Sequence, residues 1–183
     1  MDMLHTEFFK MGLDASLMTS TREKPLKTSQ KHKALIIGVP RETHNQEARV
    51  ALSPGAVGVL VANGHQVIVE HHAGQFAQFQ DREYSDNGAV IAYTKEEVYS
   101  RSQIVAKINP IAEDEYELLQ PNQTLFSAVH LGNVNPAYLK VLIEKNITAV
   151  GFEFLQAPDG SIPVMRSMSE IAGATSIHIA AEL

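Results

Sequence analysis

From Ala34 onward, short apolar runs rich in β-branched residues alternate with helix-forming stretches, and this alternation restricts the possible folds more than any other feature. The apolar runs predict strands at residues 34–39, 65–70, 89–93, 102–107, 123–129 and 147–153. Strands that alternate with helices pair in parallel through right-handed crossovers. The predicted fold class is therefore α/β, with an open, mostly parallel sheet and helices on both faces.

Several helix boundaries can be read from capping residues. Ser53-Pro54 is an N-cap followed by proline at the first helical position, and Asn63-Gly64 supplies the end of that helix. Asn135-Pro136 starts another helix that runs to about Lys145. Shorter helices are predicted at residues 94–100 and 112–119, and YSDNG (84–88) is a helix end.

The C-terminal stretch predicts one more helix. Residues 167–170, Ser-Met-Ser-Glu, match a capping box with Ser167 as N-cap and Glu170 reaching back to it. No glycine, asparagine or proline ends this helix before Leu183, although Gly173 weakens it. We therefore expect the sequence to be part of a larger protein.

Composition excludes several classes of protein. The chain has 183 residues, enough for one domain with an appendage, and 44% of them are hydrophobic. A formal net charge of −6 without a basic block argues against nucleic-acid or anionic-membrane binding. The absence of cysteine excludes disulfides, thiolate–zinc sites and a cysteine nucleophile. Without a membrane span or the apolar core of a secretory signal, we expect a cytoplasmic protein.

Residues 1–33 are predicted to be an N-terminal extension. Residues 19–33 are polar and typical of a loop, so they would link residues 1–18 to the body of the domain. The first 18 residues fit either a short amphipathic helix that docks on a neighbour or a partly ordered tail.

Three cationic or titratable residues stand where predicted strands end. Lys107 closes one strand, His130 follows another, and Arg49 lies in the long polar loop after the first. Ligands of open α/β sheets bind beyond the carboxyl ends of the strands, so the three side chains could share one edge. Arginine offers a planar fork to a carboxylate, lysine can bind a carboxylate or polarise a carbonyl, and histidine can transfer a proton. The set therefore suits a small carboxylate or keto acid.

Each of these residues also has a purely structural interpretation. Arg49 could simply pair with Glu42 or Glu47. Lys107 could be an exposed lysine at a strand end, and His130 a hydrogen-bonded histidine of the core. Pattern alone leaves both interpretations open.

Other motifs give weaker indications. His71 and His72 could suggest a metal site, but adjacent residues on a strand point apart, which favours a surface pair and no metal. Neither G-x-G-x-x-G nor a Walker-type motif occurs in the 183 residues, so no nucleotide site is recognisable. Ser85 and Ser127 lack the setting of a nucleophile elbow.

These residues lie within motifs that resemble a known family. IIGVPRETHNQEARVALSPGAV (36–57) resembles the opening of alanine dehydrogenase and of the nicotinamide nucleotide transhydrogenase α subunit. The resemblance continues through NGHQVIVEHHAGQ, IVAKINP and LFSAVHLG to MSEIAGATS. It covers about residue 34 to the end of the chain and leaves the extension outside.

The resemblance implies a fold and an activity. Alanine dehydrogenase interconverts L-alanine with pyruvate and ammonium, using NAD, and it has a Rossmann-like or flavodoxin-like substrate domain. By motif, Arg49 would hold the substrate carboxylate, Lys107 would bind the substrate beside it, His130 would transfer the proton, and Met168 would line the pocket. Residues 34–166 would form the substrate domain and 167–183 the start of an interdomain helix. A homo-oligomer is expected, with NAD bound by a domain absent from this chain.

Two features bear on the choice within the family. The spelling KINP at 107–110 is closer to transhydrogenases than to the KEP of alanine dehydrogenases. Transhydrogenases typically lack the histidine found here as His130, because hydride transfer between two nicotinamides needs no such residue. His130 therefore favours alanine dehydrogenase. The alternatives are the N-terminal domain of a proton-translocating transhydrogenase α subunit and a truncated, non-enzymatic chain.

Overall fold

Six short strands form the sheet that the sequence predicts. The computed structural model describes residues 33–43, 47–130, 132 and 135–182. Within these residues every neighbouring pair of strands is parallel. The strands in sheet order are β3 (Val90–Ala92), β2 (Gln66–Glu70), β1 (Ile36–Val39), β4 (Ile104–Ala106), β5 (Thr124–Ser127) and β6 (Thr148–Gly151). The predicted α/β fold with an open parallel sheet is confirmed.

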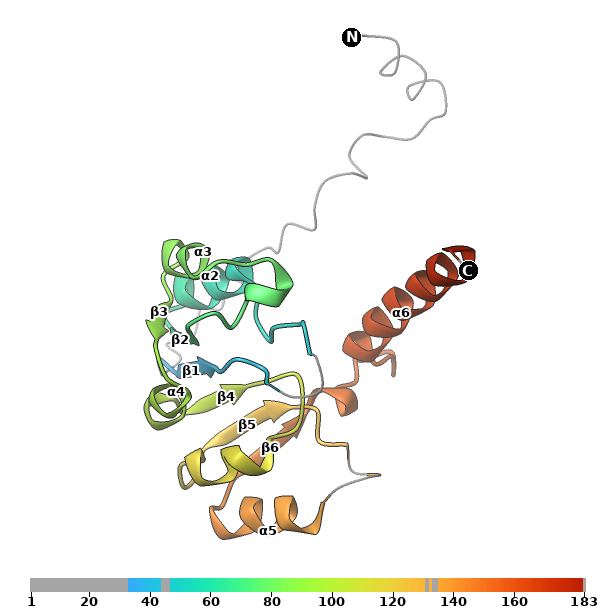
Figure 1. Cartoon of the computed structure of the whole chain (residues 1–183). Helices are drawn as coiled ribbons and strands as arrows, with labels where there is room; N and C mark the ends of the chain where they lie inside the picture. Colours follow the sequence, from blue (N-terminus) through green and yellow to red (C-terminus); the bar gives the residue numbers. More distant parts are fainter. Residues whose placement is uncertain (1–32, 44–46, 131, 133–134, 183) are drawn as a thin grey trace. The chain divides into compact units, whose positions relative to one another are not determined.

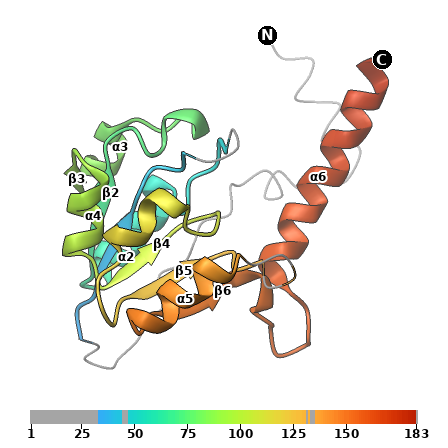
Figure 2. The same cartoon turned by 60° about the horizontal axis from the view of Figure 1, so that its bottom comes forward.

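Helices cover both faces of this sheet. Val67 and Val69 of β2 pack with α2 (Pro54–Ala62) and α3 (Asp81–Asp86), whereas Ile68 between them packs with α4 (Lys95–Arg101) on the other face. Figure 1 shows α2 and α3 on one side of the strands and α4 and α5 (Pro136–Glu144) on the other. In the turned view of Figure 2, α5 and the yellow 3-10 turn η4 (Glu113–Leu118) lie in front of the sheet.

The largest core cluster lies on the α4 and α5 face. Val105 of β4 and Leu125 of β5 contact Tyr99 of α4 and Tyr138 and Leu142 of α5. All five side chains are buried. This cluster fixes the position of the strands whose carboxyl ends form the candidate site.

Two of the three predicted N-caps are confirmed. Ser53 Oγ accepts the N–H of Ala56 at 3.3 Å, and Asn135 Oδ1 accepts the N–H of Ala137 at 2.9 Å. The capping box at Ser167 is wrong, because α6 (Pro163–Glu182) begins four residues earlier, at a proline suited to the first helical position.

Ser167 and Glu170 therefore make contacts of the helix interior. Ser167 Oγ donates to the carbonyl of Pro163 at 3.0 Å, and Glu170 pairs with Arg166 at 2.9 Å.

Two other elements differ from the prediction. Residues 112–119 were predicted as an α-helix, but they form the 3-10 turn η4, in which the buried Glu115 reaches back to the N–H of Ala112. The last strand ends at Gly151 rather than Glu153, and η6 (Phe152–Phe154) turns the chain back toward the end of β5. In both places a carboxylate contacts residues outside its own turn: Glu115 pairs with Lys95 and Lys107, and Glu153 bonds to Val129 and His130.

The N-terminal extension falls almost entirely outside the described residues, so its predicted amphipathic helix stays a prediction. The domain boundaries predicted at residues 33/34 and 166/167 likewise stay predictions. Among the described helices, none combines the length and the apolar character that crossing a membrane requires.

Candidate functional site at the carboxyl edge of the sheet

The strand order creates a crevice beside β1. The chain adds β2 and β3 on one side of β1 and then returns to its other side with β4. Connections that leave neighbouring strands in opposite directions open a crevice at their carboxyl ends, where α/β proteins bind ligands. The loop after β1 contains Arg49, and the loop after β4 begins with Lys107.

A cavity of about 730 Å³ lies at this edge. Its lining comes from the loops after β1, β4 and β5, from η6, and from α5 and α6. The polar and sulfur-containing lining residues include Arg49, Asn109, His130, Tyr138, Glu153, Met165 and Met168. Three of the four residues predicted for the site thus line one cavity, and the fourth, Lys107, does not.

Arg49 is held by Glu47 in a two-point ion pair. Its Nε and Nη2 lie 2.7 Å and 2.6 Å from the two carboxylate oxygens, and its backbone N–H donates to Oε1 at 3.0 Å. The hydrogen bonds from Arg49 lower the pKa of Glu47 to about 2 despite partial burial, and the same pair raises the pKa of Arg49. Half of the Arg49 side chain is exposed, so the guanidinium remains open to a ligand from the cavity.

Lys107 is buried in a network of charges. Its Nζ lies 2.9 Å and 2.7 Å from the two carboxylate oxygens of Glu115 and 3.6 Å from Oε2 of Glu42. Lys95 adds a second ammonium at 2.9 Å from Glu115. With only 3% of its surface exposed, Lys107 is not the exposed strand-end lysine of the structural interpretation.

The charges of this network balance. Burial raises the pKa of Glu115, but the charge and hydrogen bonds of Lys107, with smaller contributions from the N–H of Ala112 and from Lys95, together hold that pKa below its usual range. Two ammonium groups therefore face two carboxylates. Glu42 also accepts the N–H of Ile108 at 2.6 Å, which joins the loop after β1 to the loop after β4.

His130 is exposed at the cavity rather than part of the core. Its backbone has a φ of 50°, in the left-handed region that non-glycine residues seldom adopt. Oε1 of Glu153 accepts the N–H groups of Val129 at 2.7 Å and of His130 at 2.9 Å. These two bonds hold the end of β5 in the turn that presents the imidazole.

Glu153 also contributes charge to the cavity. Burial raises its pKa, but the backbone hydrogen bonds, with His130 nearby, bring the net value below the usual range. Its second oxygen, Oε2, is buried and has no hydrogen-bond partner among the described residues. An ionised carboxylate with one free oxygen thus lies beside His130.

Sequence reasoning missed several lining residues, among them Glu153 and Met165. Glu153 was treated as the last residue of a strand, although a carboxylate at a strand end on the same edge as His130 was a usable signal. Met165 precedes Met168 by one helical turn, and this spacing could have been recognised only with the true start of α6.

The geometry suits a small anion with a carbonyl or amino group. Arg49 can grip a carboxylate, and His130 and Glu153 can accept or donate a proton beside it. The aromatic and methionine residues give the rest of the lining an apolar character. Nothing in the 183 residues has the glycine-rich motif of a dinucleotide site.

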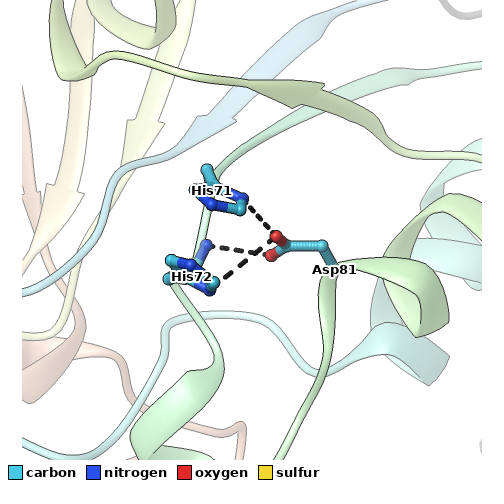
Figure 3. A group of neighbouring side chains, drawn as sticks. All are labelled: His71, His72 and Asp81. Carbon is cyan, nitrogen blue, oxygen red and sulfur yellow. Dashed lines mark hydrogen bonds and ion pairs between the residues drawn. The ribbon is translucent and has the colours of Figure 1, made fainter.

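Within the described residues, a group of side chains that could bind a metal ion lies away from this cavity. One donor atom from each of His71, His72 and Asp81 lies within 4.8 Å of the others, outside the 730 Å³ cavity (Figure 3). The expectation that the two histidines point apart is wrong. His72 follows the strand in a left-handed conformation with φ of 62°, and the two ring centroids lie 3.6 Å apart.

Known proteins match most of this chain. An alanine dehydrogenase of Methanococcus maripaludis is 38% identical over 148 residues, 81% of this chain and 39% of that protein. One from Mycolicibacterium smegmatis is 33% identical over 147 residues, which are 80% of this chain and 39% of the relative. The chain therefore spans about two-fifths of the length of the curated relatives it matches.

Solved structures agree with these matches. An L-alanine dehydrogenase superposes with a TM-score of 0.75 at 37% identity, covering 79% of this chain and 40% of that one. A transhydrogenase from Sinorhizobium meliloti shares the fold, with a TM-score of 0.59 at 22% identity over 64% of this chain and 35% of that one. The model described as "Alanine dehydrogenase/PNT, N-terminal domain" matches residues 38–172, and the chain belongs to this family.

Proposed function

We propose that this chain forms the substrate-binding part of an NAD-dependent alanine dehydrogenase, which converts L-alanine, NAD and water to pyruvate, ammonium and NADH. The main support is that Arg49, His130 and Met168, assigned by motif, line a single cavity at the carboxyl edge of the sheet. The relatives named alanine dehydrogenase match this same region.

Arg49 binds the substrate carboxylate in this proposal. The guanidinium already holds one carboxylate, that of Glu47, through two parallel bonds. A substrate carboxylate can take the same place or share the exposed donors, because five N–H groups are available on one guanidinium. Glu47 would then keep its hydrogen bond from Asn109, at 3.2 Å.

His130 transfers the proton that accompanies hydride removal. Oxidation of the amine gives an imine, and water adds to it, so protons must leave nitrogen and the added water. An imidazole titrates near neutral pH and can accept them. Glu153 holds the backbone of His130 and places a negative charge beside the ring.

Lys107 remains assigned to the substrate by its motif, with a condition that follows from its geometry. Its ammonium must turn from Glu115 toward the cavity to touch a ligand, since it now contacts Glu115 and Glu42. Lys95 can balance Glu115 during such a movement. In the present geometry Lys107 lies 3.6 Å from Glu42, and Glu42 accepts hydrogen bonds from Ile108 and Asn109, which line the cavity.

NAD accepts the hydride when it is bound, and the proposal places its binding outside residues 1–183. Met168 would close the apolar side of the substrate pocket from α6, which would be the start of an interdomain helix. We further propose a cytoplasmic homo-oligomer whose ligands are L-alanine and pyruvate rather than nucleic acid or membrane.

Activity of the longest natural product that contains this chain tests the proposal. Wild type should reduce NAD with L-alanine, and His130→Ala should lose this activity while remaining folded. The exposed His178 on α6 provides the matched control, and His178→Ala should retain the activity.

The second candidate is the N-terminal domain of a transhydrogenase α subunit. The sequence KINP at 107–110, which is closer to that of transhydrogenases, favours it. Hydride exchange between NAD(H) and NADP(H) analogues, without any alanine oxidation, would replace the first proposal by this one.

A further inference from the structure

A cluster of metal-binding side chains lies at the carboxyl end of β2, separate from the substrate cavity. His71 and His72 follow the strand directly, and Asp81 is the first residue of α3. Figure 3 shows both imidazoles facing the same carboxylate. Together the three residues enclose the segment 73–80, which contains the 3-10 turn η3 (Gln75–Ala77).

The donor atoms already converge. Nδ1 of His71 contacts Oδ2 of Asp81, and Nδ1 of His72 lies 3.9 Å from the same oxygen. One donor from each residue lies within 4.8 Å of the other two. Ligand atoms around a tetrahedral zinc ion, each about 2.0–2.1 Å from the metal, are about 3.3 Å apart. Small side-chain rotations therefore suffice to bring all three within bonding distance of one ion.

The carboxylate is oriented for this task by the backbone. Oδ1 of Asp81 accepts the N–H of His72 at 2.9 Å, which leaves Oδ2 to face the imidazoles. Only 22% of the Asp81 side chain is exposed, whereas the two histidine side chains are 39% and 48% exposed. A second hydrogen bond that fixes a ligating carboxylate is a common feature of metal sites.

The backbone at His72 brings the two rings together. With φ of 62°, His72 departs from the alternation that would send neighbouring side chains to opposite faces. The ring of His71 is bounded on another side by Tyr93, at 5.5 Å between centroids. The arrangement thus gives two adjacent histidines one common direction.

We propose that His71, His72 and Asp81 bind one Zn²⁺ ion, which ties the end of β2 to the start of α3. Two imidazole nitrogens and one carboxylate oxygen match zinc, whereas Ca²⁺ and Mg²⁺ prefer all-oxygen sites. Three protein ligands leave the fourth position to water. A cavity of about 490 Å³, lined in part by His72, Asp81 and Gln80, provides room for it.

Zinc titration of the chelator-treated chain tests the proposal. Titration calorimetry in a non-coordinating buffer should give one zinc site per chain. The melting temperature of the chain should rise with the zinc concentration. His72→Asn suits the left-handed backbone, and Asp81→Asn keeps the oxygen that accepts the N–H of His72. Each variant should weaken zinc binding by at least about tenfold. His178→Ala, the matched control on α6, should bind zinc as wild type does.

A second measurement does not depend on any variant. Crystals of the chain grown with zinc should show anomalous scattering at the zinc edge between the two imidazoles and Oδ2 of Asp81. The proposal is overturned if zinc is absent from this place, or if the two asparagine variants bind zinc as tightly as His178→Ala. Neither result depends on the alanine dehydrogenase activity, because none of the three residues lines the substrate cavity.

Discussion

At the scale of single residues, Arg49 fits both interpretations that its sequence position allows. It pairs with Glu47, as the structural interpretation expects, and it lines the cavity, as the functional one expects. The two are compatible, because the half-exposed guanidinium has N–H donors that Glu47 does not use. In the proposed function, Glu47 would hold the guanidinium in position until a substrate carboxylate binds.

The ion pair of Arg49 and Glu47 should make the unfolding free energy depend on pH in the acidic range. The folded-state pKa of Glu47, about 2, lies below the ordinary glutamate value of 4.5. A carboxyl with a depressed pKa stabilises the fold above its unfolded pKa, and that stability is lost as the pH falls through the folded value. Because Arg49 is half-exposed, we expect Glu47→Gln to lower the unfolding free energy by about 0.5–1 kcal/mol at neutral pH.

Urea denaturation checks this expectation. The difference between wild type and Glu47→Gln should shrink when the pH is lowered from about 6 to about 3. Glu96→Gln, at an exposed position of α4, is the control and should show little difference at either pH. A difference for Glu47→Gln that stays constant over this range would contradict the assigned pKa.

Sequence alone predicted some residues of the site and missed others for physical reasons. Arg49 and His130 were identifiable because their chemistry and their place after a strand are local properties. Glu153 was missed because its role depends on a 3-10 turn that returns it to residues 23 and 24 positions earlier in the chain. The direction of the His72 side chain depends on a left-handed backbone conformation that the residue type alone does not predict.

At the scale of elements, the boundaries were predictable where a local capping bond decides them. Ser53 and Asn135 each precede a proline and bond to the next turn. Ser167 was predicted from a capping box with Glu170 but lies inside α6, because Pro163 starts the helix first. Where long-range ion pairs compete, as at Glu115 in η4, propensity predicted the wrong kind of helix.

Replacement of the two serines should separate a real cap from an apparent one. Ser53→Ala removes an acceptor for the N–H of Ala56 and should cost about 1 kcal/mol of unfolding free energy. Ser167→Ala, inside an exposed helical turn, should change stability by less than about 0.5 kcal/mol. Equal losses in thermal or urea denaturation would show that Ser167 also acts as a cap.

The network around Lys107 joins four parts of the fold, so its loss should lower the stability of the whole domain. Lys107 follows β4, Glu115 lies in η4, Lys95 starts α4, and Glu42 belongs to the loop after β1. Lys107→Met leaves the buried Glu115 with one cation fewer and should lower the unfolding free energy by about 3–5 kcal/mol. Adding Glu115→Leu should restore part of this loss, because it removes the uncompensated charge.

An exposed lysine provides the control for this prediction. Lys140→Met changes a lysine whose side chain is 73% exposed, and it should cost less than about 0.5 kcal/mol. Chemical denaturation of the single variants and the double variant completes the comparison. A Lys107→Met variant as stable as Lys140→Met would mean that the buried ion pair contributes nothing.

At the scale of the whole molecule, the alternation of strands and helices was sufficient to predict the fold. Parallel pairing follows from crossover connections, and the reversal of direction beside β1 then places the crevice. The sequence could not predict the order β3-β2-β1-β4-β5-β6, since each short strand is apolar enough to pair with several others. The arrangement of the site could not be predicted for the same reason, because its residues come together only in that strand order.

The 183-residue chain alone should not oxidise alanine. In the proposed function its cavity binds the substrate carboxylate beside His130, but hydride transfer also requires a nicotinamide held against the substrate carbon. Such orientation can supply roughly 7–11 kcal/mol of a barrier, and the sequence contains no dinucleotide motif to provide it. Purified chain with L-alanine and NAD should therefore form no NADH above the rate without alanine.

Pyruvate binding provides the companion measurement, because it needs only the residues present. Pyruvate should shift nuclear magnetic resonance signals of residues around the cavity, and Arg49→Ala should weaken binding by about tenfold or more, as expected for a lost charge-assisted bond. Arg82→Ala, an exposed arginine away from the cavity, should bind pyruvate as wild type does. Binding without turnover would separate the two halves of the reaction: this chain selects the carboxylate, and hydride transfer depends on groups outside it. Alanine-dependent NADH formation by the chain alone would instead mean that these 183 residues position both reactants.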